Sequence, residues 1–306
     1  MPIREVEKIW FNGRLVDWKD ARIHVLTHGL HYGTGVFEGI RAYETRNGTA
    51  VFRLTDHLKR FYRSAKIYFM EIPFTLDELR EACKAVVREN SLKSAYIRPI
   101  AFRGYGEMGL YPLNSPVDVA VAAWSWGTYL GDEGIRSGIR VKTSSFRRID
   151  VNTIPAGVKA TGQYINSVLA KVEAKMAGYD EAVMLDSRGM VSEGSGENIF
   201  MIRNSIVYTP STSSGILEGI TRDTVFHIAG DMGLKVVERD LTRVDFYYAD
   251  EAFMSGTAAE VVPVVEMDNY KIGDGKPGPI TRRIQDEFYR IVRGESEKYS
   301  HWLEPV

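Results

Sequence analysis

The chain contains a single cysteine, Cys83, among its 306 residues. One cysteine can form neither an internal disulfide nor a thiolate metal cluster, so disulfide-stabilised secreted folds and cysteine-based zinc sites are excluded. Cys83 shares helical spacing with apolar neighbours, which indicates a small core residue rather than a nucleophile. Glutamine is also scarce, with only Gln163 and Gln285, and few thermolabile amides are a feature of heat-adapted proteins.

The sequence has neither an excess of one charge nor a long hydrophobic run. Lys+Arg 39 and Asp+Glu 40 give a net charge of -1, so no global field favours nucleic acid or an anionic membrane. The most apolar window, residues 117–126, contains Asp118 and is too short to span a bilayer. The first eight residues lack the apolar core of a signal peptide. We therefore expect no nucleic-acid or membrane partner and a cytoplasmic location.

Strand and helix patterns are mixed along the chain without regular alternation, which favours two α+β domains. The strand patterns are short, apolar or alternating, and bounded by turns such as Asn47-Gly48; they cover residues 8–11, 14–16, 40–43, 50–53, 94–102, 117–126, 139–143, 181–185 and 199–202. The helical patterns repeat apolar residues every three or four positions and cover residues 55–69, 75–87, 165–176, 220–232 and 280–291. Thr75 and Glu78 fit a capping box at the second helix.

A glycine-rich stretch interrupts these patterns near the middle of the chain. It follows Trp126, has no periodicity and is typical of an interdomain connection. We predict a small N-terminal domain of residues 1–126, an interdomain loop of residues 127–137 and a larger domain of residues 138–306.

Two motifs suggest chemistry that their surroundings do not support. His24, His28 and His31 are close in sequence, but no carboxylate or cysteine nearby completes a metal site, so we expect no metal. The glycines of residues 33–39 resemble a dinucleotide loop, yet the spacing is one residue too long and no βαβ pattern surrounds it.

Two charged residues stand among small and apolar neighbours. Lys159 follows Pro155, Ala156, Gly157 and Val158, and a lysine that loses hydration there becomes available as a nucleophile, although a plain exposed lysine before a helix is an equal alternative. Glu193 precedes Gly194-Ser195-Gly196, where small residues let the backbone approach a ligand closely.

Small-residue segments elsewhere could bind an anion. Residues 219–222 open a helix, whose first backbone N–H groups favour phosphate, and Thr221 adds a hydroxyl, although Thr221 could simply cap the helix. Residues 254–260 form a second loop of small residues at a strand end. Phosphate binding, a lysine amine and a carboxylate for a ring nitrogen together describe pyridoxal 5′-phosphate chemistry, in which the ring accepts electrons from the substrate's Cα.

At this point the sequence resembles the branched-chain amino acid aminotransferases, which belong to the class IV, fold type IV pyridoxal-phosphate aminotransferases. The resemblance runs essentially from end to end and is most specific in residues 31–41, 95–99, 153–159, 192–198, 219–222 and 255–258. It implies a two-domain α+β fold of the D-amino-acid-aminotransferase type, with a smaller N-terminal α/β domain and a larger domain with a β-barrel-like core. It also implies transamination between leucine, isoleucine or valine and 2-oxoglutarate, with pyridoxal 5′-phosphate as cofactor.

The resemblance also assigns roles to individual residues. Lys159 would form the Schiff base and carry the proton, Glu193 would pair with the pyridine nitrogen, and Tyr164 would hydrogen-bond the 3′-oxygen. The other cofactor contacts would hold the phosphate or pack on the ring: Arg60, Ile220, Thr221, Thr257 and Leu217. The substrate contacts would line an apolar pocket or bind carboxylates: Tyr32, Phe37, Gly39, Tyr96, Arg98, Leu110, Trp126, Tyr129, Thr257, Ala258 and Ala259.

Within that set, Tyr96 and the backbone of Thr257 and Ala258 would take the α-carboxylate, and Arg98 the second carboxylate of glutamate. The loop of residues 108–110 would come from a partner subunit, which implies at least a homodimer. Mammalian members carry a Cys-x-x-Cys redox pair, but Cys83 is alone, so thiol regulation is not implied.

Three other activities share this fold or cofactor. A D-amino-acid or (R)-amine aminotransferase and an aminodeoxychorismate lyase would use the same Lys159 and Glu193. Residues 38–41 and 96–99 favour the branched-chain interpretation. A cofactor-binding protein without activity is a further alternative, and the presence of Lys159, Tyr164 and Glu193 argues against it.

Overall fold

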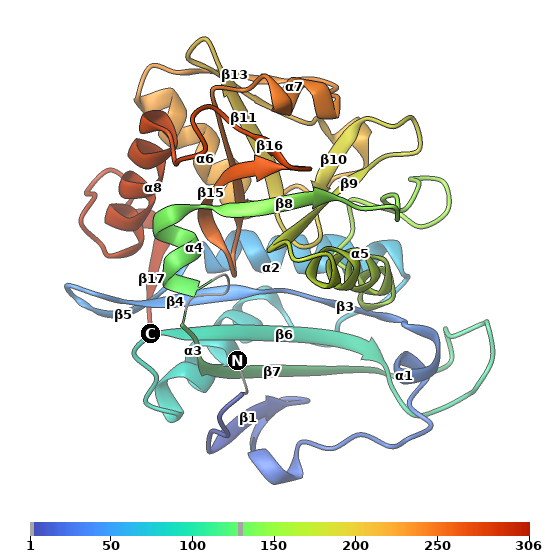
Figure 1. The fold of residues 1–306 in the computed structure, drawn as a ribbon. Helices are drawn as coiled ribbons and strands as arrows, with labels where there is room; N and C mark the ends of the chain where they lie inside the picture. The colour runs from blue at the N-terminus through green and yellow to red at the C-terminus, as the bar shows by residue number, and fades with distance from the viewer. Residues whose placement is uncertain (1–2, 128–130) are drawn as a thin grey trace. The chain divides into compact units, whose positions relative to one another are not determined.

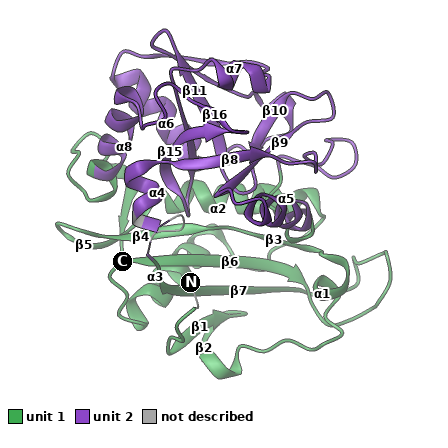
Figure 2. Cartoon of the chain, viewed as in Figure 1, with its two compact units in different colours: residues 1–126, 158–162, 290–306 green, residues 127–157, 163–289 purple. Residues whose placement is uncertain are grey.

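The structure is a computed structural model that describes residues 3–127 and 131–306 (Figure 1). The chain divides into two compact units, one of residues 1–126, 158–162 and 290–306 and one of residues 127–157 and 163–289 (Figure 2). The segments 158–162 and 290–306 belong to the first unit, whereas the division made from the sequence places them in the larger domain. Backbone pairing explains their place, because Ala160 bridges to Val36 and the last strand pairs with a strand of the first unit.

The first unit contains an eight-stranded sheet in the order β17-β5-β4-β6-β7-β1-β2, with β3 paired to β6. All of these pairs are antiparallel. The strands are β1 (Lys8–Phe11), β2 (Arg14–Asp17), β3 (Gly35–Phe37), β4 (Ile40–Thr45), β5 (Gly48–Phe52), β6 (Ala95–Arg103), β7 (Val117–Ser125) and β17 (Leu303–Pro305).

The helices of the first unit are α1 (His28–Tyr32), α2 (Leu54–Ile67) and α3 (Leu76–Glu89), with 3-10 turns η1 (Trp18–Asp20) and η4 (Ser300–Trp302). The capping box expected at α3 is present, since Thr75 Oγ1 accepts from Glu78 N at 3.3 Å and Glu78 Oε2 accepts from Thr75 N at 2.6 Å. Leu58, Phe61 and Cys83 are fully buried between the helices and the sheet. Burial raises the pKa of the Cys83 thiol, which agrees with an unreactive core residue.

The second unit contains a nine-stranded sheet in the order β10-β9-β8-β15-β14-β11-β12-β13, with β16 paired to β15. Strand β8 is parallel to β9 and β15, and β12 is parallel to β13, while the other pairs are antiparallel. The strands are β8 (Ile139–Thr143), β9 (Glu181–Leu185), β10 (Val191–Gly194), β11 (Asn198–Arg203), β12 (Ile206–Thr209), β13 (Lys235–Glu238), β14 (Glu251–Gly256), β15 (Glu260–Met267) and β16 (Tyr270–Lys271).

The remaining helices are α4 (Gly131–Ser137), α5 (Tyr164–Met176), α6 (Ile220–Asp231), α7 (Arg243–Tyr247) and α8 (Pro279–Val292), with 3-10 turns η2 (Thr161–Gln163) and η3 (Thr212–Ser214). Helix α5 packs on β8 and β9, and α6 packs on β13 and β14. Phe200 and Phe253 stack in the interior with ring centroids 4.7 Å apart. Within the described ranges, no helix has both the length and the apolar character that a membrane crossing requires.

Candidate active site

Lys159 lies on a short segment that pairs with the sheet of the first unit. Its carbonyl accepts a hydrogen bond from Phe37 N at 3.0 Å, and its own N–H donates to Ser64 Oγ at 3.2 Å. Val158 and Ala160 on either side are buried, and Lys159 is half-buried. Its Nζ lies 5.1 Å from the centroid of the Phe37 ring. The backbone of this lysine is therefore held on both sides, which restricts where its amine can reach.

Three buried ionisable side chains form a cluster beside Phe37. Arg60 donates from Nε to Glu38 Oε1 at 2.7 Å and from Nη2 to Oε2 at 2.8 Å, and His57 Nδ1 lies 2.8 Å from Oε2. Burial alone would raise the pKa of Glu38, but the ion pair with Arg60 and the contact with His57 lower it well below its ordinary value. Burial lowers the pKa of His57. Arg60 is thus held by a bidentate contact in one orientation, as arginines that bind anions require.

Gly39 and Tyr96 fit together closely in the first unit. A Cβ added at Gly39 would lie only 1.9 Å from Tyr96 Oη, so a side chain at this position would displace the hydroxyl. Arg98 Nη2 donates to the same Tyr96 Oη at 3.2 Å. Gly39 therefore keeps a hydroxyl and a guanidinium next to each other.

Aromatic rings surround this guanidinium. Arg98 Cζ lies 4.6 Å from the Phe37 centroid and 5.9 Å from that of Trp124. The Tyr96 ring contacts both Trp124 at 5.2 Å and Trp126 at 4.8 Å. A buried Arg98 Nε has no hydrogen-bond partner among the described residues. An arginine with an unused hydrogen-bond donor can bind a carboxylate. The aromatic rings around it can contact an aliphatic side chain in the same place.

Helix α1 and the loop next to it each carry one further residue that the resemblance assigns. His28 Nδ1 lies 2.8 Å from Thr34 Oγ1, and its Nε2 lies 2.7 Å from the carbonyl oxygen of Gly109. His28 therefore anchors the loop. In the part of the chain that the structure describes, no three metal-ligating side chains lie close enough together to bind a metal ion. Tyr32 on α1 and Leu110 in the loop are 44% and 90% exposed. Tyr129, also assigned to the substrate pocket, lies outside the described residues.

Three donors fix the carboxylate of Glu193 in the second unit. Its Oε1 lies 3.0 Å from Arg148 Nε, and its Oε2 accepts from Asn198 Nδ2 and from the backbone N–H of Leu217, each at 3.0 Å. Glu193 and Arg148 are both buried. Glu193 is the third of the four residues of β10. A buried carboxylate oriented by an arginine, an amide and a backbone N–H can present one defined charge to a ligand.

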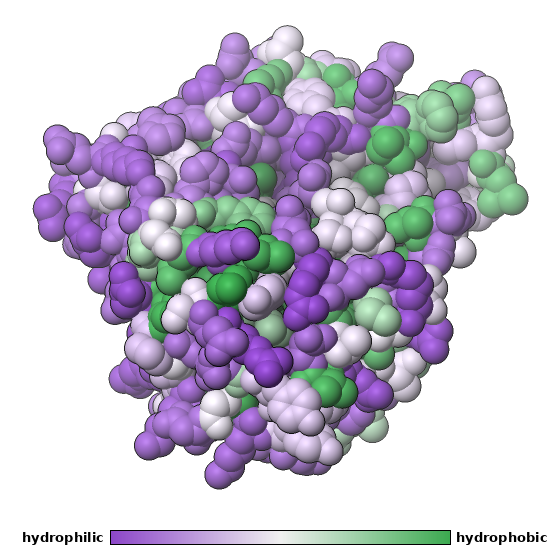
Figure 3. All heavy atoms as spheres, turned by 90° about the horizontal axis from the view of Figure 1, so that it is seen from above, coloured by the Kyte–Doolittle hydropathy of each residue, from purple (hydrophilic) through white to green (hydrophobic). Residues whose placement is uncertain are grey.

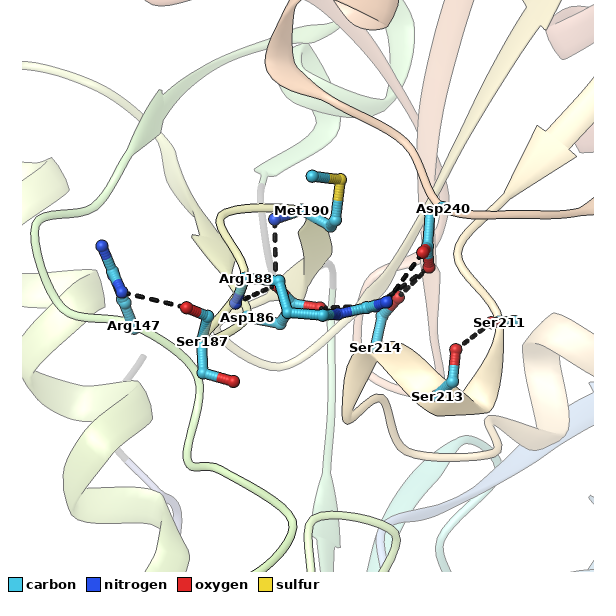
Figure 4. A network of polar contacts seen from close by, with 9 residues as sticks. All are labelled: Arg147, Asp186, Ser187, Arg188, Met190, Ser211, Ser213, Ser214 and Asp240. Atoms are coloured by element: carbon cyan, nitrogen blue, oxygen red, sulfur yellow. Dashed lines mark hydrogen bonds and ion pairs between the residues drawn. The ribbon is translucent and has the colours of Figure 1, made fainter.

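A polar network holds the segments that lead to Glu193 and Leu217 (Figure 4). Arg188 contacts Asp240 through Nη1 at 2.8 Å and Nη2 at 3.0 Å, and Asp186 through Nη2 at 2.8 Å. Asp186 Oδ1 accepts from the backbone of Met190, directly before β10, and Ser214 Oγ donates to Asp240 at 3.4 Å. One arginine therefore joins the turn before β10 to the segment before Leu217.

Helix α6 begins without a side-chain cap. Its N-cap is Gly219, so the first N–H groups of the helix have no side-chain acceptor at that position. A Cβ at Gly219 would lie 2.1 Å from Asn198 Oδ1, which explains why glycine stands there. Ile220 is half-buried and Thr221 is buried. A helix N-terminus with this geometry favours a phosphate group.

The turn between β14 and β15 packs against the turn that follows Glu193. A Cβ added at Gly256 would lie 3.3 Å from Gly196 O and 3.4 Å from Glu197 Cγ. Thr257 and Ala258 in this turn are half-buried and Ala259 is buried. Tyr164, at the start of α5, is also half-buried.

Two further buried carboxylates lie close to the turn that follows Glu193, namely Glu197 at its end and Glu181 at the start of β9. Glu181 accepts from Ser195 Oγ at 2.5 Å and forms an ion pair with Lys171, and Glu197 Oε2 accepts from Gly196 N at 3.1 Å. Both carboxylates are buried. Burial, with the nearby Glu181 charge, raises the pKa of Glu197 to about 8. Glu197 is therefore largely protonated at neutral pH.

Within each unit, contacts connect many of the residues that the resemblance assigns. The first unit joins Phe37 to Lys159 and to Arg98, and Arg98 to Tyr96. The second unit joins Glu193 to Leu217 directly. The residues that orient these groups were not assigned from the sequence, namely Glu38, His57, Trp124, Arg148 and Asn198. Only the general rule that a buried carboxylate needs partners could have suggested them.

Comparison with known proteins gives matches over nearly the whole chain. The family "Amino-transferase class IV" matches residues 35–267. A "Branched-chain-amino-acid aminotransferase" from Pseudomonas aeruginosa is 52% identical over 294 residues, covering 96% of this chain and 95% of its own. The T.th. branched-chain amino acid aminotransferase with pyridoxamine 5′-phosphate superposes with a TM-score of 0.96 at 50% identity, covering 99% of each chain.

A second structure of the T.th. enzyme, complexed with N-(5′-phosphopyridoxyl)-L-glutamate, superposes with a TM-score of 0.93 at 49% identity and 98% coverage of each chain. These matches extend over the strands, helices and loops described above, and the fold is that of the type IV aminotransferases. This chain belongs to the class IV amino-transferase family.

Proposed function

We propose that this chain transfers the amino group between branched-chain L-amino acids and 2-oxoglutarate, with pyridoxal 5′-phosphate as cofactor. The products are the branched-chain 2-oxo acids and L-glutamate. The observation that carries the proposal is the Glu193 carboxylate, which three donors hold in one orientation. The names of the relatives support the substrate class, and the ligands of the two T.th. structures support the cofactor and glutamate.

The residues present fit this cofactor chemically. The uncapped start of α6 suits its phosphate, and the buried Glu193 suits a protonated ring nitrogen. Pyridoxal 5′-phosphate, when bound, supplies a ring that accepts electrons from the substrate's Cα. The residues that we assign to hold it are Arg60, Lys159, Tyr164, Glu193, Leu217, Ile220, Thr221 and Thr257.

Lys159 has two tasks in this proposal. Its amine would attach the cofactor covalently, and with a substrate bound Nζ would carry the proton at the substrate's Cα. A held backbone and a flexible four-carbon side chain suit this pair of tasks, because the amine must swing over a short range without losing its place.

The substrate site must accept an aliphatic chain and a second carboxylate in turn. We assign the aliphatic chain to the aromatic walls that surround Arg98, including Phe37 and Trp126, and the second carboxylate to Arg98 itself. Tyr96, with the backbone of Thr257 and Ala258, binds the α-carboxylate. The other residues that we assign to this site are Tyr32, Gly39, Leu110, Tyr129 and Ala259.

We further propose that the active form is at least a homodimer in the cytoplasm. Leu110 is 90% exposed on a loop that His28 anchors, which suits a residue that completes the site of a second copy. Because the relatives named above act on branched-chain amino acids by name, we prefer this activity to a D-amino-acid or (R)-amine aminotransferase and to an aminodeoxychorismate lyase.

A half-reaction panel tests the proposal. The purified holoenzyme is mixed with L-leucine, L-valine, L-glutamate, D-alanine or (R)-1-phenylethylamine, and the cofactor's absorbance is followed. We expect conversion with the three L-amino acids and none with a Lys159→Ala variant. Conversion by D-alanine or the (R)-amine alone would replace the proposal with one of its alternatives.

A further inference from the structure

Two carboxylates in the second unit are shielded from water. Hydrophilic residues cover much of the molecular face drawn in Figure 3, where water can stabilise their charges. Glu181 and Glu197, in contrast, are 0% and 4% exposed. A buried carboxylate must either find a cation and hydrogen bonds or keep its proton.

Glu181 has the partners that an ionised carboxylate requires. Lys171 of α5 forms an ion pair with its Oε2. Ser195 Oγ donates to its Oε1 at 2.5 Å, and the backbone N–H of Ala182 donates to the same oxygen at 2.7 Å. A cation and two further donors keep the charge of Glu181 in place.

Glu197 has no comparable cation. Its Oε2 accepts from Gly196 N at 3.1 Å, and Glu197 forms no ion pair within residues 3–127 and 131–306. Burial and the nearby charge of Glu181 raise its pKa to about 8. Glu197 is therefore a neutral, protonated group at pH 7 and becomes charged only in alkaline solution.

The cations near Glu197 are already paired with other carboxylates. Lys171 pairs with Glu181, and Arg148 Nε lies 3.0 Å from Glu193 Oε1. The charges of Glu181 on β9 and Glu193 on β10 both act on Glu197. An ionised Glu197 would therefore add a buried negative charge that these two cations do not balance.

Glu197 also forms part of the turn that joins Glu193 to Asn198. The backbone N–H of Gly194 donates to Glu197 O at 2.7 Å and closes this turn. A Cβ added at Gly194 would lie 3.0 Å from Glu197 Oε2, so the side chain folds back over the turn. Asn198 Nδ2 donates to Glu193 Oε2 at 3.0 Å across the same turn. The shape of the turn therefore determines how Asn198 meets Glu193.

The side chain of Glu197 packs against the neighbouring turn between β14 and β15 as well. A Cβ added at Gly256 would lie 3.4 Å from Glu197 Cγ. Gly256 directly precedes Thr257, which we assign to the cofactor phosphate. Glu260, the register partner of Gly256, adds a carboxylate to this turn and accepts from Tyr289 Oη at 3.0 Å. Glu197 therefore contacts both the turn that orients Glu193 and the turn assigned to an anionic group.

We infer that protonated Glu197 is a positioning residue of the cofactor site, and that loss of its proton weakens cofactor binding at alkaline pH. The neutral side chain fills the turn beside Glu193 without repelling it. The ionised side chain would repel the Glu193 carboxylate and the cofactor phosphate in a poorly screened interior. This inference rests on the cofactor site of the proposed function and adds a residue that the resemblance does not assign.

Cofactor affinity measured against pH tests the inference. Apoenzyme is titrated with pyridoxal 5′-phosphate by absorbance at several pH values, for the native chain and for Glu197→Gln. The glutamine keeps the size and the neutral charge but has no proton to lose. We expect native Kd to lie within about threefold of the variant's at pH 7 and to exceed it about 5- to 10-fold at pH 9. One proton changes an affinity by at most about 10-fold per pH unit above its pKa.

Glu197→Ala tests the packing role separately. It leaves the buried N–H of Gly196 without its acceptor, so cofactor Kd should rise about 10-fold at pH 7. The alanine has no proton to lose either, so its difference from the native chain should shrink toward pH 9. This trend keeps the inference testable if the glutamine variant does not fold, which circular dichroism checks.

Glu251→Gln is the matched control. Glu251 is also buried and lies at the opposite end of β14 from Gly256. Its carboxylate accepts from Ile280 N at 3.0 Å and Thr281 N at 2.7 Å, at the start of α8. The ratio of its cofactor Kd to that of the native chain should not change between pH 7 and pH 9.

The outcomes separate this inference from the proposed function. A ratio for Glu197→Gln that is constant between pH 7 and pH 9 overturns the inference, as does the same pH dependence in Glu251→Gln. A native chain that binds no cofactor at any pH overturns both. If the ratio changes as expected but none of the L-amino acids converts the cofactor in the half-reaction panel, only the proposed function fails.

Discussion

At the scale of single residues, Glu193 is the carboxylate on which the proposed chemistry depends. Glu193→Gln keeps the shape and the hydrogen bond from Leu217 but removes the charge that faces Arg148 and that we assign to the ring nitrogen. We expect cofactor to stay bound and turnover to fall by roughly 100-fold or more. Absorbance of the bound cofactor and steady-state kinetics measure the two effects. Glu297→Gln on the exposed surface is the control, and near-native turnover of the Glu193 variant would refute its role.

Arg98 is the residue to which we assign the second carboxylate of glutamate. Arg98→Ala should raise KM for 2-oxoglutarate and glutamate by about 10-fold or more, since hydrogen bonds to charged groups contribute about 1.5–3 kcal/mol. Leucine has no second carboxylate and should lose much less. Arg98→Lys keeps the charge without the planar fork and should fall between the two. An equal loss for all substrates would make Arg98 a structural residue.

Glu197 gives a pH-dependent effect on stability. Its pKa rises from 4.5 to about 8 on folding, because it is buried near Glu181 and Glu193 with Lys171 as a partly compensating cation. Between these values the unfolded chain loses the proton while the folded chain keeps it, so the folded state is progressively destabilised as pH rises. Glu197→Gln cannot lose a proton there, and its free energy of unfolding relative to the native chain should increase by a few kcal/mol between pH 5 and pH 8.5.

Denaturant unfolding at several pH values measures this difference, again with Glu297→Gln as the control. The two curves should approach each other only as the pH falls below the ordinary glutamate pKa of 4.5, where Glu197 is protonated in both states. A difference independent of pH would mean that Glu197 is already ionised in the folded protein.

At the scale of elements, Gly219 at the start of α6 serves two purposes. It leaves the first N–H groups of the helix without a side-chain acceptor, and it leaves room for Asn198. Gly219→Ala would place a methyl group 2.1 Å from Asn198 Oδ1, so Asn198 must move and its contact with Glu193 must weaken. We expect at least about a 10-fold loss of cofactor affinity, measured by absorbance titration of the apoenzyme. Gly230→Ala in the same helix meets open space and should stabilise the protein by about 0.5–1 kcal/mol without changing that affinity. Equal affinity for both variants would contradict the assignment.

Several helices and strands could be predicted from short sequence motifs at their ends. Thr75 and Glu78 form the capping box that the sequence predicts, and Asn47-Gly48 lies at the hairpin of β4 and β5. The residues that interact in these motifs are neighbours along the chain, so a short stretch of sequence includes every residue that takes part. For α5, the periodicity predicts the helix and the shared face of Ile165 and Val172, but whether that face is inside depends on β8 and β9, which come from other parts of the chain.

At the scale of the whole molecule, cofactor removal should lower stability. The residues assigned to pyridoxal 5′-phosphate range from Arg60 to Thr257 in sequence, so only the folded chain can assemble them. A ligand that binds only the folded state stabilises that state by about 2.7 kcal/mol when the free ligand concentration is 100 times Kd. Thermal unfolding should shift upward with cofactor concentration, while pyridoxal without the phosphate should shift it much less. A melting temperature independent of cofactor would contradict the proposed site.

The family of this chain was determined by its sequence alone. The resemblance carried by residues 31–41, 153–159 and 192–198 predicted a class IV aminotransferase, and the comparisons confirm that family and its fold. The residues that we assign to the cofactor lie in short segments, and the phosphate, aldehyde and ring nitrogen of the cofactor limit which side chains can bind them.

What only the tertiary structure decided is which groups hold those residues in place. Arg148 and Leu217 orient Glu193, Glu38 and His57 orient Arg60, and the outer face of α5 is left apolar. Each of these depends on distant segments that folding brings together. A buried charge requires a suitable partner nearby in space, but the spacing of the two residues in the sequence can have any value. Short motifs therefore specify the chemistry, and long-range packing specifies its orientation.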